Sequence, residues 1–274
     1  MILQKKNYSN FILTHKYVAN ILDSIRKSFV SKRKFNLFNI KKDVVLKILH
    51  ITNFNQRFNG RLHYNTGTRL NNGFIRLGHN VLTISDRDII NKSKNITDYS
   101  GKRTLQNAIL ENHKNFNTDC IVLGHADSVA NATLDYLKNI NKNLRICQWF
   151  LDPLGINGPD YQKNLARIQH KQENLDATFL TTDPAVLKGS LPNSHFIPNP
   201  CDKSFETLKN YENNNINDLS YKLAKYKKDH KERKRIAKNG KDFYLKELNS
   251  TLVADYILSK TLDYKSKNKF VWSK

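Results

Sequence analysis

Residues 44–51 read Val44-Val45-Leu46-Lys47-Ile48-Leu49-His50-Ile51, an almost continuous apolar run rich in β-branched residues. A strand with one face in water alternates polar and apolar side chains, whereas this run is apolar on both faces. Parallel strands that are covered by helices on each side have this pattern. We therefore predict that residues 44–51 form a strand of a parallel sheet.

Five further short apolar runs follow, at residues 81–84, 120–123, 144–151, 177–181 and 195–198. The stretches between them have apolar residues at three- and four-residue steps, which is typical of helices. Strand and helix alternating at this spacing indicate right-handed βαβ units. The sequence therefore predicts an α/β fold with an open, doubly wound, Rossmann-like parallel sheet. The residues expected to share helix faces are Leu62, Leu70, Phe74 and Leu77; Leu105, Ala108 and Ile109; and Val129, Thr133, Tyr136, Leu137 and Ile140.

The strand pattern stops after Pro200, and residues 201–274 contain helical patterns only. Since one βαβ unit takes about 30 residues or more, we predict no second nucleotide-binding sheet in this segment. The polar run at residues 212–215 is expected to be a loop or linker. We thus divide the chain into a helical extension (1–43), a Rossmann-like domain (44–200) and a helical C-terminal segment (201–274). Apolar residues expected on helix faces of the last segment are Leu219, Leu223 and Tyr226; Ile236, Gly240 and Tyr244; and Leu252, Val253, Tyr256 and Ile257.

The chain is strongly basic, with 46 Lys and Arg against 24 Asp and Glu in 274 residues and a formal net charge of +22. Lys and Asn are abundant throughout, so a general drift toward these residues also gives a basic protein. A basic surface attracts nucleic acid or anionic lipid weakly. Because no zinc-finger spacing, RNP-like aromatic motif or recognition helix accompanies the charge, we expect no specific nucleic-acid partner.

Residues 1–43 carry ten Lys and Arg against two Asp. We predict that this extension forms a basic amphipathic helix, which either packs on the main domain or lies on an anionic membrane surface. The sequence leaves both alternatives open. The apolar residues that recur at the spacing of one helix face are Tyr17, Val18, Ile21, Leu22, Ile25 and Phe29.

Cysteine usage and hydropathy indicate a cytoplasmic protein. Cys120, Cys147 and Cys201 lack metal-ligand spacing, so we expect reduced, structural thiols and no metal site. We find no apolar span of ~20 residues and no leader ending at a small-residue cleavage site, so neither a membrane span nor export is expected. Peripheral attachment to the inner face of the membrane follows if residues 1–43 lie on lipid.

Ligands of an open parallel sheet bind beyond the carboxyl ends of its strands, so the residues that follow each strand are candidates for a site. The loop after the first strand contains Asn53 and Gly60, and a glycine near a helix start lets backbone N–H groups approach an anion. Arg57 or Arg61 is placed to clamp that anion. Asp86 follows the second strand, where dinucleotide folds often bind ribose, but Gly-x-Gly-x-x-Gly and the phosphate-loop motif are both missing. We therefore predict no nucleotide redox cofactor.

Two later strand ends carry side chains suited to proton chemistry. His125 follows the third strand, and a histidine of near-neutral pKa can take a proton from a sugar hydroxyl or donate a hydrogen bond to a developing charge. Asp127 is a candidate substrate ligand, although Asp127 or Ser128 can instead cap the next helix. Asp152 is held out of a helix by the proline that follows it and is expected to face the same crevice, with turn formation as the alternative.

The last apolar run leads into the sequence Pro198-Asn199-Pro200-Cys201-Asp202. Two prolines around Asn199 make a stiff, extended connector, which is expected of a hinge between domains. We therefore assign Asn199 and Asp202 to a candidate hinge, with a rigid exit loop as the alternative.

Several of these stretches, taken in order, resemble a GT-B fold glycosyltransferase. Lys47–Ile51 with its loop and helix, followed by Phe74-Ile75-Arg76-Leu77-Gly78-His79-Asn80-Val81, is similar to the opening of that fold. Ile197-Pro198-Asn199-Pro200-Cys201-Asp202 resembles the Ile-Pro-Asn-x-x-Asp crossover into the second domain, and Arg235–Gly240 resembles the closing helices. The nearest group is the family 1/4-like group that includes spore-maturation-type glycosyltransferases. The likeness covers residues 44–210 and 217–262, and the order of the motifs carries it.

The resemblance implies transfer of a sugar from a nucleotide-sugar donor to an acceptor that the sequence does not identify, without a bound metal or other cofactor. The N-terminal domain of this family holds the acceptor, and the C-terminal domain binds the nucleotide. By position, the family implies that Asn53, Gly60 and Arg61 lie near the acceptor or the donor phosphates. It likewise implies that His125 lies against the donor sugar or the reacting hydroxyl, and that Asp152 lines the cleft. The transition state has oxocarbenium character, and its diphosphate leaving group needs hydrogen-bond donors.

The sequence departs from the family in the donor-binding half. The phosphate-clamping cations and the nucleotide-binding carboxylates of the family lie between the crossover and the closing helices, and this segment is missing around residues 213–217. The resemblance therefore predicts a chain that is inactive alone or that depends on a partner protein supplying the donor half. The alternative function is a non-catalytic Rossmann-like module that binds a sugar or an anion, either free or at a membrane.

Overall fold

A computed structural model describes residues 44–187, 191–205 and 229–273 of the chain. The helical extension expected at residues 1–43 lies outside the described residues. So do the linker expected at residues 212–215 and the helix expected around Leu219, Leu223 and Tyr226.

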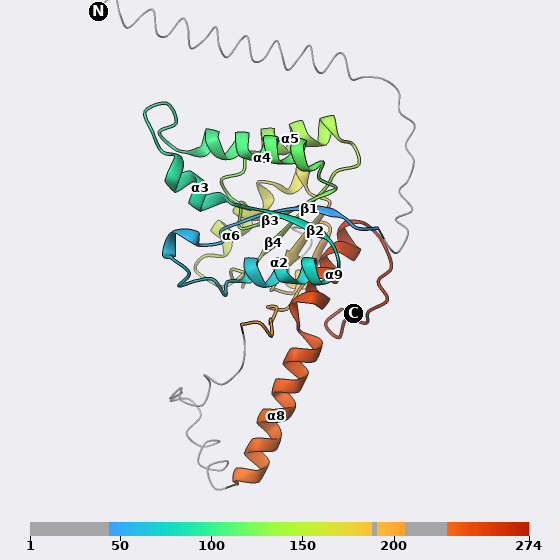
Figure 1. Cartoon of the computed structure of the whole chain (residues 1–274). Coiled ribbons are helices and arrows are strands. Elements are labelled where there is room, and N and C mark those ends of the chain that lie inside the picture. The colour runs from blue at the N-terminus through green and yellow to red at the C-terminus, as the bar shows by residue number, and fades with distance from the viewer. Residues whose placement is uncertain (1–43, 188–190, 206–228, 274) are drawn as a thin grey trace, which may run out of the picture. The chain divides into compact units, whose positions relative to one another are not determined.

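All six expected strands are present and pair in parallel in one sheet, which confirms the predicted α/β, Rossmann-like fold (Figure 1). The strand order is β2-β1-β3-β4-β5-β6. The chain therefore runs from β1 to one side and returns to the other side to form β3. This change of direction makes the carboxyl ends of β1 and β3 the expected ligand crevice. The strands are β1 (Lys47–Thr52), β2 (Asn80–Ser85), β3 (Cys120–Gly124), β4 (Arg145–Phe150), β5 (Ala177–Leu180) and β6 (Ser194–Phe196).

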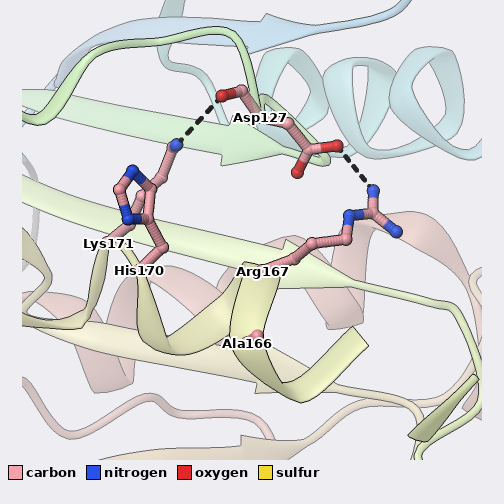
Figure 2. A pocket seen from close by; sticks show the side chains of 5 residues that line it. All are labelled: Asp127, Ala166, Arg167, His170 and Lys171. Atoms are coloured by element: carbon pink, nitrogen blue, oxygen red, sulfur yellow. Dashed lines mark hydrogen bonds and ion pairs between the residues drawn. The ribbon is translucent and has the colours of Figure 1, made fainter. Parts of the chain in front are cut away.

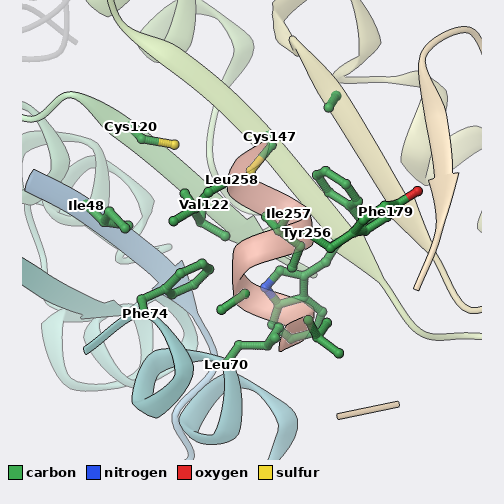
Figure 3. Packing of buried hydrophobic residues seen from close by; sticks show 14 of the residues in the cluster. Ile48, Leu70, Phe74, Cys120, Val122, Cys147, Phe179, Tyr256, Ile257 and Leu258 are labelled. Carbon is green, nitrogen blue, oxygen red and sulfur yellow. The ribbon is translucent and has the colours of Figure 1, made fainter. Parts of the chain in front are cut away.

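Successive residues of β1 face two different cores. Ile48 packs with helices α2 and α9, in the cluster that Figure 3 shows, whereas Leu49 and Ile51 pack with α4 and α5. Helices on both faces of the sheet explain why the strand has no polar face. The helices are α2 (Thr66–Arg76), α3 (Asp86–Ser93), α4 (Lys102–Phe116), α5 (Asn131–Ile140), α6 (Tyr161–Gln169), α8 (His230–Glu247) and α9 (Ser250–Thr261), with 3-10 turns at Gln56–Phe58, Gln172–Asn174 and Pro184–Leu187.

Helix α9 completes the first of these cores, although it belongs to the segment predicted as a C-terminal remnant. A Cβ on Gly73 of α2 would lie 2.2 Å from the carbonyl oxygen of Ser250, so the two helices are in backbone contact. Val253 and Ile257 of α9 are fully buried. The described part of residues 201–274 therefore shares one core with residues 44–200, and it contains helices but no strand.

Helix α8 differs from the other long helices because none of its 18 residues is buried. The chain at the C-terminal end of this helix is nevertheless hydrogen-bonded to another segment. Cys201 N–H donates to the carbonyl of Leu248 at 2.9 Å, and Ser250 N–H donates to the carbonyl of Cys201 at 2.7 Å. These two bonds attach the end of α8 to the connector that follows β6.

Two helices begin later than the apolar pattern predicts. Leu62 precedes α2, whose N-cap Asn65 accepts a hydrogen bond from the backbone N–H of Thr68 at 3.0 Å. Val129 precedes α5, whose N-cap is Ala130. The side-chain cap of Asn65 therefore overrides the periodicity of the apolar residues at α2, whereas the N-cap of α5 makes no side-chain cap bond.

Candidate functional site

The carboxyl ends of β1 and β3 meet at a close backbone contact. Thr52 Oγ1 donates to the carbonyl oxygen of Gly124 at 2.8 Å. A Cβ on Gly124 would lie 2.0 Å from Cζ2 of Trp149, so only glycine leaves room for that ring. The next residue, His125, has a φ of +48°, a left-handed conformation that turns the chain sharply as the strand ends.

His125 is held by the end of β4. Its imidazole stacks on Phe150 with ring centroids 4.3 Å apart, and its Nε2 accepts a hydrogen bond from the backbone N–H of Leu151 at 3.0 Å. The neutral ring therefore carries its proton on Nδ1, which lies 3.7 Å from Asp152 Oδ2. Burial lowers the pKa of His125 below its usual value, while the Asp152 carboxylate opposes this shift. His125 is thus neutral at pH 7, and both ring nitrogens face fixed partners.

The structure brings His125 and Asp152 together, as the sequence predicts. Of the two side chains, Asp152 is the one with lone pairs available to accept a proton. The side chain of Asp152 is 45% exposed. For His125 to accept a proton, Nε2 would have to release the N–H of Leu151. Asp152 is therefore better placed than His125 to take a proton from a bound hydroxyl, and His125 is better placed to orient Asp152.

Arg167 of α6 joins this pair to Asp127. Its Nη1 lies 3.0 Å from Asp152 Oδ2, and its Nη2 lies 2.6 Å from Asp127 Oδ2. The guanidinium also lies over the ring of Phe150, 4.9 Å from the centroid. Sequence reasoning missed Arg167, because nothing in the sequence distinguishes an arginine that binds carboxylates from one that is solvated on the surface of an amphipathic helix.

A hollow of about 310 Å³ opens beside Arg167 (Figure 2). Besides Asp127, Ala166 and Arg167, it is lined by His170 and Lys171. Lys171 is buried, and its Nζ lies 3.4 Å from the carbonyl oxygen of Asp127. Burial lowers the pKa of Lys171, and the negative charges of Asp127 and Asp86 oppose this effect. The basic lining is suited to an anionic or strongly polar ligand.

Asp86, at the end of β2, is a buried carboxylate whose Oδ1 has no hydrogen-bond partner among the described residues. Burial raises the pKa of Asp86 to about 6, although the backbone N–H and the charge of Arg87 oppose the shift. A buried polar atom left unpaired costs stability, and such costs are typical of functional sites. An acid after the second strand often binds ribose in dinucleotide folds, but the sequence lacks their glycine motif and so does not single out Asp86 as a site residue.

Asn53 and Arg57 lie in a second cluster, built around Asp88. Asp88 accepts hydrogen bonds from Gln56 N–H and Arg57 N–H and forms an ion pair with Arg57 Nη1 at 3.0 Å. Arg57 Nη1 also donates to Asn53 Oδ1 at 3.0 Å. The guanidinium predicted to clamp an anion therefore holds the loop after β1 in shape instead.

The glycine expected at the helix start is a different one. Gly60, with a φ of +82°, lies in the turns before α2, and a Cβ added there would meet open space. At Gly67, within α2, a Cβ would lie 2.6 Å from Thr52 Cγ2, so this glycine brings the helix close to the end of β1. Arg61 is exposed and lies over the ring of Phe58, with 5.7 Å from the guanidinium carbon to the centroid.

The predicted capping role of Asp127 or Ser128 is wrong. Helix α5 begins after Ala130, whose N–H donates to the side-chain oxygen of Gln106 on α4 at 3.0 Å. A side chain distant in the sequence thus satisfies the helix start. Asp127 is left to bind Arg167.

The candidate hinge is anchored at one end. Asn199 is exposed, whereas Asp202 is buried and accepts hydrogen bonds from Asn72 at 2.9 Å and from Arg76 at 2.8 Å, both on α2. Burial raises the pKa of Asp202, but the bonds from Arg76, Ser204 and Asn72 outweigh it and lower the pKa to about 2. These contacts fix the connector to α2, which is the behaviour of a rigid exit loop.

The three cysteines are buried and none is in a disulfide, as the sequence predicts. The described residues contain no cluster of His, Cys, Asp or Glu that could hold a metal ion. Within the same residues, no helix is both long and apolar enough to cross a bilayer.

The fold and the site define an α/β protein with a Rossmann-like parallel sheet and a charged cluster at its carboxyl edge. Comparisons of the sequence with protein-family models and with curated proteins find no match.

Proposed function

We propose that the chain is the acceptor-side half of a GT-B-like glycosyltransferase. In this proposal the carboxyl edge of the sheet binds an acceptor hydroxyl, and the sugar comes from a nucleotide sugar. The Rossmann-like sheet and the order of the family-like motifs support the assignment. The observation that carries it is the exposed Asp152 carboxylate, which is paired with Arg167 and lies 3.7 Å from His125 Nδ1, beside the expected ligand crevice.

The proposed reaction uses Asp152 as the base. The acceptor oxygen forms a bond to the anomeric carbon of the donor sugar, the bond from that carbon to the diphosphate breaks, and Asp152 receives the hydroxyl proton. The nucleoside diphosphate leaves with the electron pair. The Nδ1–H of His125 faces Asp152, and Arg167 keeps its second carboxylate partner, Asp127, when Asp152 becomes neutral.

The proposal includes a partner protein that supplies the donor half. The described residues after Pro200 contain helices but no strand, so they offer no second sheet to bind the nucleotide. Along α8, 18 residues have no buried side chain, which leaves the helix surface open to another chain. The stabilisation of the diphosphate would come from that chain.

An add-back assay tests the role of Asp152. Cell extract from a strain that lacks this chain is supplied with labelled nucleotide sugars and with purified wild-type protein or variants. We expect wild type to restore transfer and Asp152→Asn to lower the rate about 100-fold or more, because a positioned base contributes about 10²–10⁴-fold. The control is Asp160→Asn, an exposed carboxylate that makes no side-chain cap bond at the start of α6. Equal rates for the two variants would contradict the proposal.

A second candidate function is a non-catalytic module for an anionic sugar. The basic lining of the hollow beside Arg167, with Lys171 and His170, favours this alternative. Substitution His125→Ala separates the two functions. A binding module should keep its affinity for a nucleotide sugar or sugar phosphate in a calorimetric titration, whereas an enzyme should lose transfer because Asp152 is no longer oriented.

A further inference from the structure

The loop between α3 and α4, residues 94–101, presents large apolar side chains to solvent. Ile96 is fully exposed and Tyr99 is 91% exposed. Single exposed apolar residues are common, but two on one short loop with almost their whole surface in water are not explained by the fold. They lie beside a hollow of about 440 Å³ that Lys94 and Asn95 also line.

The 94–101 loop has an ordered backbone with its polar groups turned inward. Asn95 Oδ1 accepts hydrogen bonds from Thr97 N–H at 2.9 Å and from Asp98 N–H at 2.8 Å. Asp98 in turn accepts from the N–H of Thr104 at 2.7 Å, which ties the loop to the start of α4. A Cβ on Gly101 would lie 2.3 Å from the carbonyl oxygen of Ile90, so the loop is also packed on α3. The polar groups of the loop are thus hydrogen-bonded within the protein, whereas Ile96 and Tyr99 are exposed to solvent.

The charges around the 94–101 loop have one sign. Lys92, Lys102 and Arg103 flank it and Lys94 lies within it, while the acid within it, Asp98, is buried and bonded to Thr104. A rim of cations around exposed apolar side chains is complementary to a surface that is apolar inside and anionic at its boundary. An anionic lipid bilayer has this composition.

The 94–101 loop lies at the carboxyl edge of the sheet, as does the candidate site. Helix α4 runs back to the start of β3, which is parallel to β2, so α4 must begin near the carboxyl ends of the strands. Figure 1 shows the loop projecting at that side, above the segment that follows β1. Contact through the loop would leave the carboxyl edge facing the same surface.

We propose that the 94–101 loop docks on the surface of an anionic membrane, with Ile96 and Tyr99 inserted at the level of the headgroups. Tyrosine is favoured at this depth, where its ring lies in apolar surroundings and its hydroxyl stays hydrated. Lys92, Lys94, Lys102 and Arg103 contact the lipid phosphates. This inference does not depend on glycosyl transfer and concerns a different part of the chain from residues 1–43.

Vesicle flotation of the full chain tests the docking. Wild type is mixed with vesicles of phosphatidylcholine and phosphatidylglycerol, and the variant Ile96→Ser/Tyr99→Ser is compared with Ile236→Ser/Phe243→Ser. The second variant is a matched control, since Ile236 and Phe243 are exposed apolar residues of α8. We expect the loop variant to lower the partition coefficient at least about tenfold and the control to leave it unchanged, because only the first removes inserted apolar area. Failure of wild type to float, or equal binding of both variants, overturns the proposal.

A fluorescent label reports insertion directly and distinguishes lipid from a second copy of the chain. The native cysteines are buried, so Ile96→Cys offers an accessible thiol for an environment-sensitive dye. We expect a blue shift on adding the anionic vesicles and none on adding phosphatidylcholine alone. No shift with anionic vesicles overturns the proposal, as does a shift that appears without lipid when the protein concentration rises, since that would indicate self-association.

Discussion

His50 is a fully buried histidine in the middle of the sheet, and its environment fixes it in the neutral form. Its Nε2 accepts a hydrogen bond from Trp149 Nε1 at 3.3 Å, and its Nδ1 faces Asn71 Oδ1 at 3.5 Å. Burial lowers the pKa of His50 from 6.5 to about 4, and the contact with Asn71 opposes that shift only in part. The imidazole is therefore a structural group that links β1, β4 and α2.

The lowered pKa of His50 predicts a loss of stability in mild acid. Between pH 6.5 and pH 4 the unfolded chain binds a proton that the folded chain does not, so the free energy of unfolding falls as the pH falls. From pH 7 to pH 5 we expect this group to contribute a loss of about 2 kcal/mol. In urea titrations at both pH values, His50→Gln should show a loss smaller by this amount. An unchanged pH dependence in the variant would contradict the assignment.

Asp86 and Asp88 predict opposite effects for the same substitution, two residues apart. Because burial raises the pKa of Asp86 to about 6, the stability that the folded state has below pH 4 is lost as the pH rises through 6. Asp86→Asn should therefore raise the free energy of unfolding at pH 8 by about 1–3 kcal/mol and change it little at pH 4.

Asp88→Asn serves as the control for Asp86→Asn. Burial raises the pKa of Asp88, but hydrogen bonds from Ser85, Gln56 and Arg57 outweigh burial and lower it. Removing this charge at pH 8 should destabilise the fold by about 1–3 kcal/mol, because the loop after β1 loses charged hydrogen bonds. Destabilisation of the protein by both variants at pH 8 would contradict the assignment of Asp86 Oδ1 as a buried atom without a hydrogen-bond partner.

At the scale of single residues, the sequence predicts which positions reach the carboxyl edge better than it predicts their partners. His125 and Asp152 follow adjacent strands, so the topology alone brings them together. Arg167 meets Asp152 and Asp127 only through the packing of α6, which no local pattern specifies. Arg57 has the charge for an anion clamp, but its use depends on Asp88 from another element.

At the scale of elements, the six strands follow from their apolar runs, because helices cover both faces of the sheet. The position of α9 does not follow from its sequence, since an apolar helix face shows that a partner exists without naming it. The informative residue is Gly73, whose missing side chain lets α2 and α9 touch. The need for glycine at this position is evident only when α2 and α9 are both placed in the structure.

The contact between α2 and α9 predicts a large effect of one methyl group. Gly73→Ala places a Cβ 2.2 Å from the Ser250 carbonyl oxygen, so we expect a loss of about 1–3 kcal/mol in the free energy of unfolding. Gly240→Ala is the matched control in α8, where a Cβ meets nothing within 4 Å. This second change should stabilise the protein by about 0.5–1 kcal/mol, because alanine favours a helix over glycine. Thermal unfolding measures both, and a stable Gly73→Ala variant would contradict the close packing.

At the scale of the whole molecule, the described chain forms one α/β unit. Helix α9 packs against the sheet of this unit, whereas helix α8 buries none of its residues. The absence of a strand among residues 201–205 and 229–273 agrees with the sequence pattern. The structure by itself gives no reason why β6 is the last described strand. The proposal that a partner supplies the donor half gives α8 and the open carboxyl edge a common purpose.

The most direct measurement of this account is transfer of a labelled sugar by three samples: the purified chain, an extract that lacks the chain, and the two combined. The account predicts labelled product only in the combined sample, with the rate rising as purified chain is added. Full transfer by the purified chain alone would contradict the need for a partner. No transfer in any sample, across uridine, guanosine and adenosine diphosphate sugars, would contradict the assignment to glycosyl transfer.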